Sequence, residues 1–346
     1  GIDAVFALTE RAVVPAARIR QRLGLAGDPP IAARRSTDKL AMKRAVAAAG
    51  IPCARFVGAD EGLDPDQLVA ELGLPMVVKT RRLGYDGKGE YVVRNEADKR
   101  AAWQSLGGQP LIAEQFVPFD FEVSSIGGRA ANGETRIYPL SRNLHRDGIL
   151  HTSCSPVDAA GLSDRAADFV TRLMQHLDYV GVLALELFDC DGELLANEFA
   201  PRVHNSGHWT IEGASTSQFE NHLLAICGLP LGDTGIKSPS LMFNLLGAMP
   251  GCAGRQYPHS DGADTVHWHD YHKKPREARK IGHVTVTEGG QAGLPARAAQ
   301  LAEDLGAAHE LDRVCHRACA LRLDVELAQV PHEHLTSRGA RLEHEH

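Results

Sequence analysis

Two glutamates, Glu186 and Glu198, carry the most informative chemistry in the sequence. They lie in neighbouring segments, V-G-V-L-A-L-E-L-F and E-L-L-A-N-E-F-A-P-R, whose apolar composition is typical of strands. If these strands fold back on each other, the two carboxylates lie opposite one another, and they repel unless a cation lies between them. With Asn197 beside them, such oxygen ligands suit Mg²⁺ shared with the phosphates of a nucleotide. The alternative is an exposed hairpin with two solvated glutamates.

A glycine-dense loop follows another apolar segment, P-M-V-V-K-T, which contains Lys79. The loop contains Gly84, Tyr85, Asp86, Gly87, Lys88 and Gly89. Glycines let backbone N–H groups approach phosphate oxygens, and the two lysines add positive charge, so the loop is a candidate phosphate-binding lid. It does not have the Walker A pattern. The alternatives are an ordinary hairpin turn and an edge lysine that blocks strand pairing.

Two further segments place polar groups near these features. The strand-like E-Q-F-V at 114–117, followed by Glu122, offers backbone groups to an adenine edge and a carboxylate to ribose hydroxyls, although it also resembles any buried strand. Directly after Glu198 comes P-R-V-H-N-S-G-H-W, in which Arg202 suits a carboxylate or bicarbonate and His204 can exchange a proton near neutral pH. The alternative is a structural loop whose polar groups satisfy one another.

A basic segment lies near the C-terminal end of the chain. Its five cations, Lys273, Lys274, Arg276, Arg279 and Lys280, favour a site for an anionic substrate such as a sugar phosphate. A metal site on His267 and His269 and a solvated basic turn are the alternatives.

Composition limits the classes of function. The chain has 346 residues, a net charge of −7, 43% hydrophobic and 23% charged residues, which is the balance of an ordinary globular protein. The acidic balance argues against a nucleic-acid partner, and no apolar run is long enough to cross a membrane. Seven scattered cysteines fit reduced thiols in a cytoplasmic protein.

Short strands and interspersed helices, with hairpins dominating, predict an α+β fold. We expect a partial βα domain at 1–52, a small subdomain with the glycine-rich lid at 53–117, a large subdomain at 118–330 and a polar tail at 331–346. Within the first part, the pattern predicts a helix over 36–50 with Ser36 or Thr37 as its N-cap.

The motifs occur together and in one order: K-T-R-R-L-G-Y-D-G-K-G, E-Q-F-V, L-S-R-N-L-H-R-D-G-I-L, N-E-F-A-P-R-V-H-N-S-G-H-W and R-K-I-G-H-V. In that order the sequence closely resembles the N5-carboxyaminoimidazole ribonucleotide synthase family of ATP-grasp enzymes, from about residue 75 to 288. The resemblance implies that two α+β subdomains grip ATP. It also implies a ligase of purine synthesis that converts bicarbonate to carboxyphosphate and carboxylates 5-aminoimidazole ribonucleotide. A cytoplasmic homodimer and Mg²⁺ are implied as well.

The resemblance also assigns residues. It implies nucleotide contacts for Arg35, Lys79, Gly84, Tyr85, Asp86, Gly87, Lys88, Gly89, Glu90, Glu114, Gln115, Phe116, Val117, Glu122, His145, Asn197 and Glu198. Glu186 and Glu198 are implied as Mg²⁺ ligands, and Arg202, His204 and Lys273 as the bicarbonate and carboxyphosphate site. The ribonucleotide site is implied to include Tyr85, Asp86, Asn205, Ser206, Lys273, Arg276, Arg279 and Lys280.

Both ends of the chain depart from the family pattern. A glycine-rich turn of the G-x-G-Q-L-G kind does not occur near the start, and residues 290–346 match poorly. A fragment, a fusion and a divergent member remain open. So do two other functions, an ATP-grasp ligase that joins a different acid and amine and a nucleotide-binding module without turnover.

Overall fold

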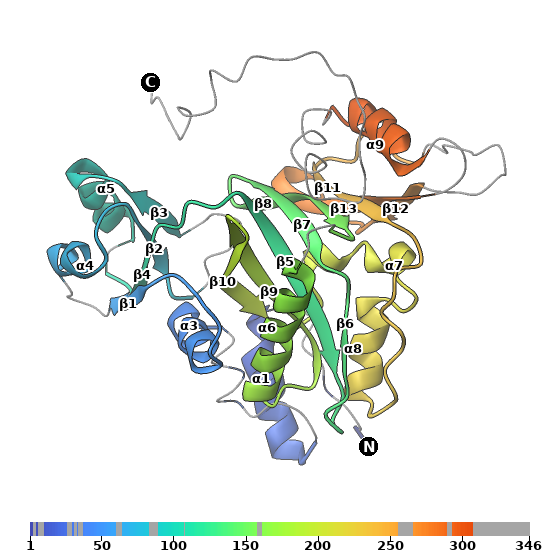
Figure 1. The fold of residues 1–346 in the computed structure, drawn as a ribbon, viewed down its shortest axis with the longest axis horizontal. Helices are drawn as coiled ribbons and strands as arrows, with labels where there is room; N and C mark the ends of the chain where they lie inside the picture. Colours follow the sequence, from blue (N-terminus) through green and yellow to red (C-terminus); the bar gives the residue numbers. More distant parts are fainter. Residues whose placement is uncertain are drawn as a thin grey trace.

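The structure is a computed structural model that describes residues 1–2, 5, 10–25, 30, 33, 37–59, 64–82, 89–106, 108–157, 161–254, 266–288 and 293–306. Within these ranges, helices pack on two antiparallel sheets (Figure 1), so the expected α+β fold is confirmed.

The smaller sheet has the order β1-β4-β2-β3, from Phe56–Ala59, Leu111–Gln115, Met76–Thr80 and Glu90–Val93. Two helices, α4 (Pro65–Leu72) and α5 (Glu96–Leu106), cover it on one side in Figure 1. Strand β2 alternates buried and half-buried residues, which leaves one face for a core with Leu68, Met76, Val78 and Ala102. That core orients Lys79, which lies on the opposite face of β2 from Val78.

The larger sheet has the order β10-β9-β5-β7-β8-β11-β13-β12, and β6 pairs with β5. In chain order its strands are β5 (Phe121–Arg129), β6 (Thr135–Ile137), β7 (Ser141–Arg146), β8 (Ile149–Ser155), β9 (Gly181–Cys190), β10 (Glu193–Ala200), β11 (Ser240–Gly247), β12 (Val266–Asp270) and β13 (Arg276–Thr287). The pattern of short strands predicted most of them, whereas β7, β8 and β11 were not resolved as separate strands from the sequence.

Helices cover different parts of the large sheet (Figure 1). Helix α6 (Leu162–His176) packs on β5, β9 and β10, where its apolar residues meet Leu183, Leu185 and Leu187. The opposite side of β9 presents Val182 and Ala184 to Trp209, next to the short η1 (Asn205–Gly207), α7 (Thr210–Gly213) and α8 (Gln218–Ile226). Helix α9 (Gly293–Asp304) covers β11 and β13, and α1 spans Glu10–Leu23.

Helix α3 (Lys39–Ala48) begins later than the sequence predicted, because its N-cap is Asp38 rather than Ser36 or Thr37. The Asp38 carboxylate accepts hydrogen bonds from the backbone N–H groups of Leu40 and Ala41. It also pairs with Arg81 at 2.8 Å, which ties the start of the helix to the end of β2. Asp38 thus serves the helix both as a cap and as one half of an ion pair.

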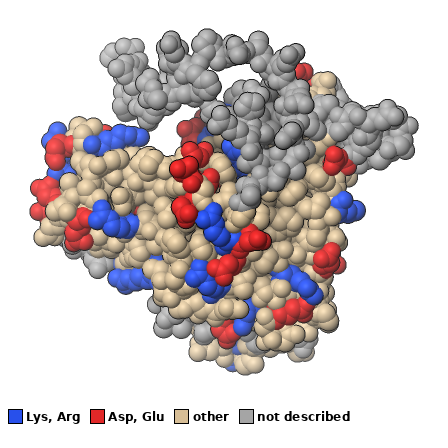
Figure 2. Space-filling view, in the orientation of Figure 1, with Lys and Arg blue, Asp and Glu red and all other residues tan. Residues whose placement is uncertain are grey.

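Other expectations meet the structure unevenly. The expectation of reduced thiols rather than a disulfide framework holds for Cys53, Cys190, Cys227 and Cys252, which are free, whereas Cys154 is disulfide-bonded. No helix in the described ranges is long and apolar enough to span a membrane. Figure 2 shows Lys and Arg interspersed with Asp and Glu over the visible face. The domain boundaries stay predictions, and the 331–346 tail lies outside the described residues.

Candidate active site

A β-bulge brings Glu186 and Glu198 to the same face of the large sheet. Up to Ala196, residues of β10 pair with β9 in one register, and from Phe199 the register is shifted by one residue. Asn197 and Glu198 therefore both oppose Glu186, two residues against one. Before the bulge, the side chains of Leu194 and Ala196 pack in the core under α6. After the bulge, it is the side chain of Phe199 that packs there, so the alternation of faces shifts by one residue. Without the extra residue Glu198 would face the apolar core.

Asn197 and Lys39 complete the surroundings of this acidic pair. Asn197 lies in the bulge with Glu198, and its Oδ1 atom is buried without a hydrogen-bond partner, so the bulge contains an unsatisfied acceptor oxygen. Lys39 donates to Glu198 at 3.0 Å, and its pKa is raised because the Glu198 charge outweighs the effect of burial. No cluster of three or more His, Cys, Asp or Glu side chains in the described ranges is arranged to hold a metal.

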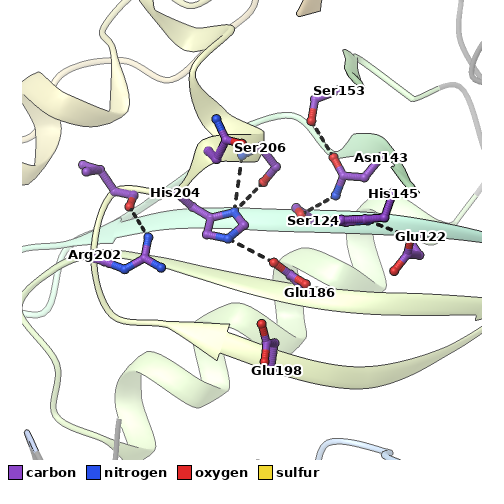
Figure 3. Close-up of polar contacts among 12 residues, drawn as sticks. Glu122, Ser124, Asn143, His145, Ser153, Glu186, Glu198, Arg202, His204 and Ser206 are labelled. Carbon is purple, nitrogen blue, oxygen red and sulfur yellow. Dashed lines mark hydrogen bonds and ion pairs between the residues drawn. The ribbon is translucent and has the colours of Figure 1, made fainter. Parts of the chain in front are cut away.

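Glu186 is paired with His204, as Figure 3 shows. The His204 Nε2 atom lies 3.0 Å from Glu186, while Nδ1 lies 2.8 Å from the Ser206 Oγ atom and accepts from the Ser206 backbone N–H. This pattern places the ring proton on Nε2, facing the carboxylate. Burial opposes ionisation of Glu186, but the hydrogen bond from His204 and the positive groups nearby, Lys39 among them, outweigh burial and lower the pKa of Glu186 to about 2. Glu186 is thus an anion at neutral pH.

The loop that carries Arg202 and His204 is fixed by buried polar contacts. Gln218 accepts from the His204 N–H at 2.9 Å and donates to the His204 carbonyl at 2.7 Å. Asn205 and Asn244 exchange two amide hydrogen bonds, and Arg202 donates to the Val203 carbonyl at 2.9 Å. Many polar groups of this loop do bond to one another, as expected if the loop were purely structural. Arg202, however, has further N–H donors that a ligand could use.

A buried polar chain crosses the sheet beside Glu186 (Figure 3). Ser124 of β5 is directly opposite Glu186 in the ladder, Asn143 donates to its Oγ atom at 2.6 Å, and Ser153 donates to Asn143 at 2.7 Å. All three side chains are buried. The chain aligns β5, β7 and β8 under the acidic pair, and each of these bonds has a defined direction.

His145 and Glu122 form a second imidazole–carboxylate pair on this face. Their atoms Nδ1 and Oε2 are 2.7 Å apart. Burial lowers the pKa of His145, but the Glu122 hydrogen bond and charge, together with the Glu186 charge, raise it overall. The charge of Lys280 lowers the pKa of His145, so the basic strand β13 comes within electrostatic range of this part of the site.

Three buried or half-buried charges connect the small sheet to the acidic pair. Glu114 of β4 lies 3.3 Å from both Lys43 and Lys79. Burial disfavours the Lys79 charge, but Glu114, Glu90 and Glu198 together raise its pKa well above the ordinary range. Glu90 is 4.0 Å from Lys79 and half exposed. Lys79 is therefore a permanent cation that faces the strand of the acidic pair.

The cations of the basic segment lie at the ends of β12 and β13. Lys273 lies over the Tyr271 ring at 4.7 Å, and burial and its cationic neighbours lower its pKa. Arg276 is exposed, and Arg279 donates to the Lys274 carbonyl. His208 is half-buried, and its pKa falls to about 3, mainly because of desolvation and also because of the charges of His204, Lys280 and Arg202. Lys280 therefore lies within electrostatic range of the 202–208 loop.

Some predicted residues lie elsewhere. Arg35 and residues 84–88 fall outside the described residues. Gly89 is described, with φ +78, and its carbonyl accepts from the Thr80 N–H. Gln115 turns its side chain to Arg55 on the surface, while Phe116 and Val117 follow β4 and are half-buried. His267 and His269 share a strand face, but His269 bonds to Glu212 at 2.7 Å.

Sequence reasoning missed Lys39, Lys43 and Gln218. The two lysines stand at i, i+4 spacing in D-K-L-A-M-K, a pattern that usually marks one face of a helix and could have flagged them. Gln218 had no local signal, because its partners lie 10 and 14 residues earlier in a loop.

Comparisons with known proteins agree with this geometry. A family model described as the ATP-grasp domain matches residues 44–219, and one described as the phosphoribosylaminoimidazole carboxylase C-terminal domain matches residues 240–295. The N5-carboxyaminoimidazole ribonucleotide synthase of Pseudomonas aeruginosa is 50% identical over 254 residues, which are 73% of this chain and 68% of that protein.

Solved structures are similar as well. The N5-carboxyaminoimidazole ribonucleotide synthetase from Thermus thermophilus has a TM-score of 0.74 and 42% identity, covering 88% of this chain and 79% of its own. The synthase from Aspergillus clavatus, in complex with ADP and 5-aminoimidazole ribonucleotide, has a TM-score of 0.78 and 27% identity, covering 89% and 82%. These matches confirm the ATP-grasp fold.

Proposed function

Because the chain belongs to the N5-carboxyaminoimidazole ribonucleotide synthase family, we propose that it carboxylates 5-aminoimidazole ribonucleotide with bicarbonate at the expense of ATP. The observation that carries this proposal is the bulge that sets Glu186 and Glu198 side by side, with His204 bonded to Glu186. The products are N5-carboxyaminoimidazole ribonucleotide, ADP and phosphate, in the cytoplasm, within purine synthesis.

The acidic pair fits Mg²⁺ on three grounds. Two carboxylates come from neighbouring strands, Asn197 Oδ1 in the bulge lacks a partner, and the ligand set is oxygen alone. Glu186 and Glu198 would hold the ion together with nucleotide phosphates, since Mg²⁺ commonly takes one or two carboxylates plus phosphate oxygens. When bound, the ion neutralises charge on the phosphates during phosphoryl transfer.

The chain's own cations serve the nucleotide. Lys79, held in its charged form by Glu114, and Lys39, held at Glu198, are placed to contact phosphate oxygens. Glu122 and the backbone of 114–117 are assigned to the ribose and adenine. Residues 84–90 are assigned as the lid that excludes water, because carboxyphosphate decomposes in water.

The reaction then proceeds in two displacements. A bicarbonate oxygen attacks the γ-phosphorus of ATP, and the bond to the ADP oxygen breaks, which gives carboxyphosphate. Arg202 binds the carboxylate as a planar fork, with Lys273 as a second cation. The substrate amine next attacks the carboxyl carbon, or CO₂ released from carboxyphosphate, and phosphate leaves. The amine loses a proton, for which the departing phosphate is the assigned acceptor, while His204, held between Glu186 and Ser206, belongs to the carboxyphosphate site.

The ribonucleotide phosphate is assigned to the basic end of β13. Arg276, Arg279 and Lys280 offer donors there, and Lys280 lies within electrostatic reach of both His145 and His208. Asn205, Ser206, Tyr85 and Asp86 are assigned to the rest of the substrate. A homodimer is part of the proposal, and sedimentation velocity of the purified chain tests it.

The proposed function is tested by ADP release in the presence of ATP and Mg²⁺. Bicarbonate and aminoimidazole ribonucleotide are added singly and together, and the proposal expects full stimulation by the complete set alone. Release that ignores the ribonucleotide but responds to another acid and amine would indicate a different ATP-grasp ligase. Tight ATP binding without turnover would indicate a binding module.

A further inference from the structure

We propose that Lys43 is a positioning residue for the metal pair, because it anchors the bulge that turns Glu198 toward Glu186. The inference rests on the proposed function, since it concerns the same acidic pair. Lys43 itself belongs to α3, far in sequence from both glutamates, and its hydrogen bonds and ion pairs go to other residues.

The first step is where Lys43 points. Its side chain is 4% exposed, and its Nζ atom donates to the Ala196 carbonyl at 3.1 Å. Ala196 is the last residue of β10 before the register shift, and it is itself buried. Lys43 therefore contacts the backbone at the point where the extra residue of the bulge enters the strand.

The second step is that both backbone polar groups of Ala196 are held by the N-terminal segment. The Ala196 N–H donates to the Pro52 carbonyl at 2.7 Å, and Cys53 forms a parallel bridge with Ala196. β10 is the edge strand of the large sheet, so these contacts cover its outer edge. The residue before the bulge is thus clamped from the side opposite to β9.

The third step is the register slip that the contacts of Lys43 and Pro52 with Ala196 prevent. A slip of one residue moves every side chain of a strand to the other face. If the bulge moved past Glu198, that carboxylate would turn toward Phe199's present surroundings, the apolar core under α6. Fixing Ala196 fixes the position of the bulge, and hence the face on which Glu198 lies.

The fourth step is why a lysine is present. Burying a charge is unfavourable unless the charge is paired, so an apolar side chain would be the simpler choice at this position of α3. Glu114, 3.3 Å away, offsets the cost, although burial still lowers the Lys43 pKa. What an apolar residue lacks is the donor for the Ala196 carbonyl. Lys43 also joins β4 of the small sheet to β10 of the large one.

The test compares Lys43→Met with a matched control, Lys99→Met. Lys99 is likewise a largely buried lysine, and it bonds to Asp66 and Glu96 within the small subdomain, away from β10. The readout is ADP affinity by isothermal titration calorimetry, with and without Mg²⁺, so that the metal-dependent part of binding is separated from nucleotide binding. Thermal unfolding of each variant checks the fold.

We expect Mg²⁺ to strengthen ADP binding in the wild type, and that strengthening to fall at least about tenfold in Lys43→Met, which is roughly 1.4 kcal/mol. ADP affinity without Mg²⁺ should change less than about threefold. Lys99→Met should keep the wild-type Mg²⁺ effect. Lys43→Arg, which keeps charge and donors, should recover most of the loss.

Two results would overturn different claims. An Mg²⁺ effect in Lys43→Met equal to that of the wild type would overturn the positioning role and leave the proposed function intact. A wild type without any Mg²⁺ effect would overturn the metal assignment itself. If Lys43→Met does not fold, Lys43→Gln takes its place with the same expectation, since its amide is one bond shorter and falls short of the Ala196 carbonyl.

Discussion

The side-chain amide of Gln218 holds both backbone polar groups of His204. Its Oε1 atom accepts from the His204 N–H at 2.9 Å, and its Nε2 atom donates to the His204 carbonyl at 2.7 Å. Gln218 is fully buried. Because the backbone of His204 is fixed in this way, its imidazole is directed at Glu186. The geometry of the proposed carboxyphosphate site thus depends on α8, a helix that contains none of the assigned ligand contacts.

We predict that Gln218→Met lowers both stability and turnover. Methionine leaves two buried backbone groups of His204 without partners, so the free energy of unfolding should fall by about 2 kcal/mol or more. The kcat value should fall roughly tenfold while ADP affinity stays near that of the wild type. Urea unfolding and steady-state kinetics measure these quantities, with exposed Gln175→Met as the control. A loss of stability at unchanged kcat would contradict the positioning role.

Removing the charge of one proposed metal ligand should abolish turnover and leave the fold intact. In Glu198→Gln we expect ADP formation to fall roughly 100-fold or more, since charge stabilisation at the transferred phosphoryl group is lost. Circular dichroism and the melting temperature should stay close to the wild type. Glu193→Gln, on the same strand and exposed, is the matched control. Wild-type turnover in Glu198→Gln would remove the basis for the metal assignment.

A methyl group at Gly207 should displace the 202–208 loop. A Cβ atom there would lie 2.5 Å from the Ile126 Cδ1 atom and 2.8 Å from the Gln218 Oε1 atom. Overpacking of this kind costs about 1–3 kcal/mol, and here it pushes on the residue that holds His204. We expect Gly207→Ala to lose stability and most activity, measured by thermal unfolding and ADP release. Gly251→Ala, where a Cβ meets open space, should behave as the wild type.

The pair of His145 and Glu122 predicts a pH dependence of stability. The pKa of His145 is raised in the folded state, so the pair stabilises the protein fully below the unfolded value of about 6.5. That contribution is lost as the pH rises through the folded value. The difference in unfolding free energy between wild type and Glu122→Gln should therefore be larger at pH 5.5 than at pH 9.

A carboxylate paired with a group that does not titrate is the control for this measurement. Glu134 pairs with Arg136 at 2.7 Å, so the effect of Glu134→Gln should not change between the two pH values. An equal or larger effect of Glu122→Gln at pH 9 would contradict the raised pKa of His145.

The opposition of Glu186 and Glu198 could be predicted from the sequence, but its cause could not. Strands joined at Gly192 pair Cys190 with Glu193, and that register alone would place Asn197 opposite Glu186. The bulge inserts one extra residue into β10, and this brings Glu198 opposite Glu186 as well. Its anchors, Lys43 and Pro52, lie about 150 residues earlier, and long-range contacts of this kind leave no local pattern.

The strands β7 and β8 show a second limit of the sequence. L-S-R-N-L-H-R-D-G-I-L contains polar residues at positions where a half-buried strand would alternate, so its strand character is weak. In the structure Asn143 and Ser153 are buried, and they satisfy each other and Ser124 across three strands. These polar residues can be buried within strands because hydrogen bonds to neighbouring strands satisfy them.

The transfer of oxygen from bicarbonate to phosphate tests the central claim most directly. With ¹⁸O-labelled bicarbonate, ATP, Mg²⁺ and aminoimidazole ribonucleotide, a short reaction should yield inorganic phosphate that carries one ¹⁸O atom per turnover, because a bicarbonate oxygen forms the bond to the γ-phosphorus. Phosphate that carries oxygen from water alone, formed at the same rate as ADP, would show that bicarbonate is not phosphorylated at this site.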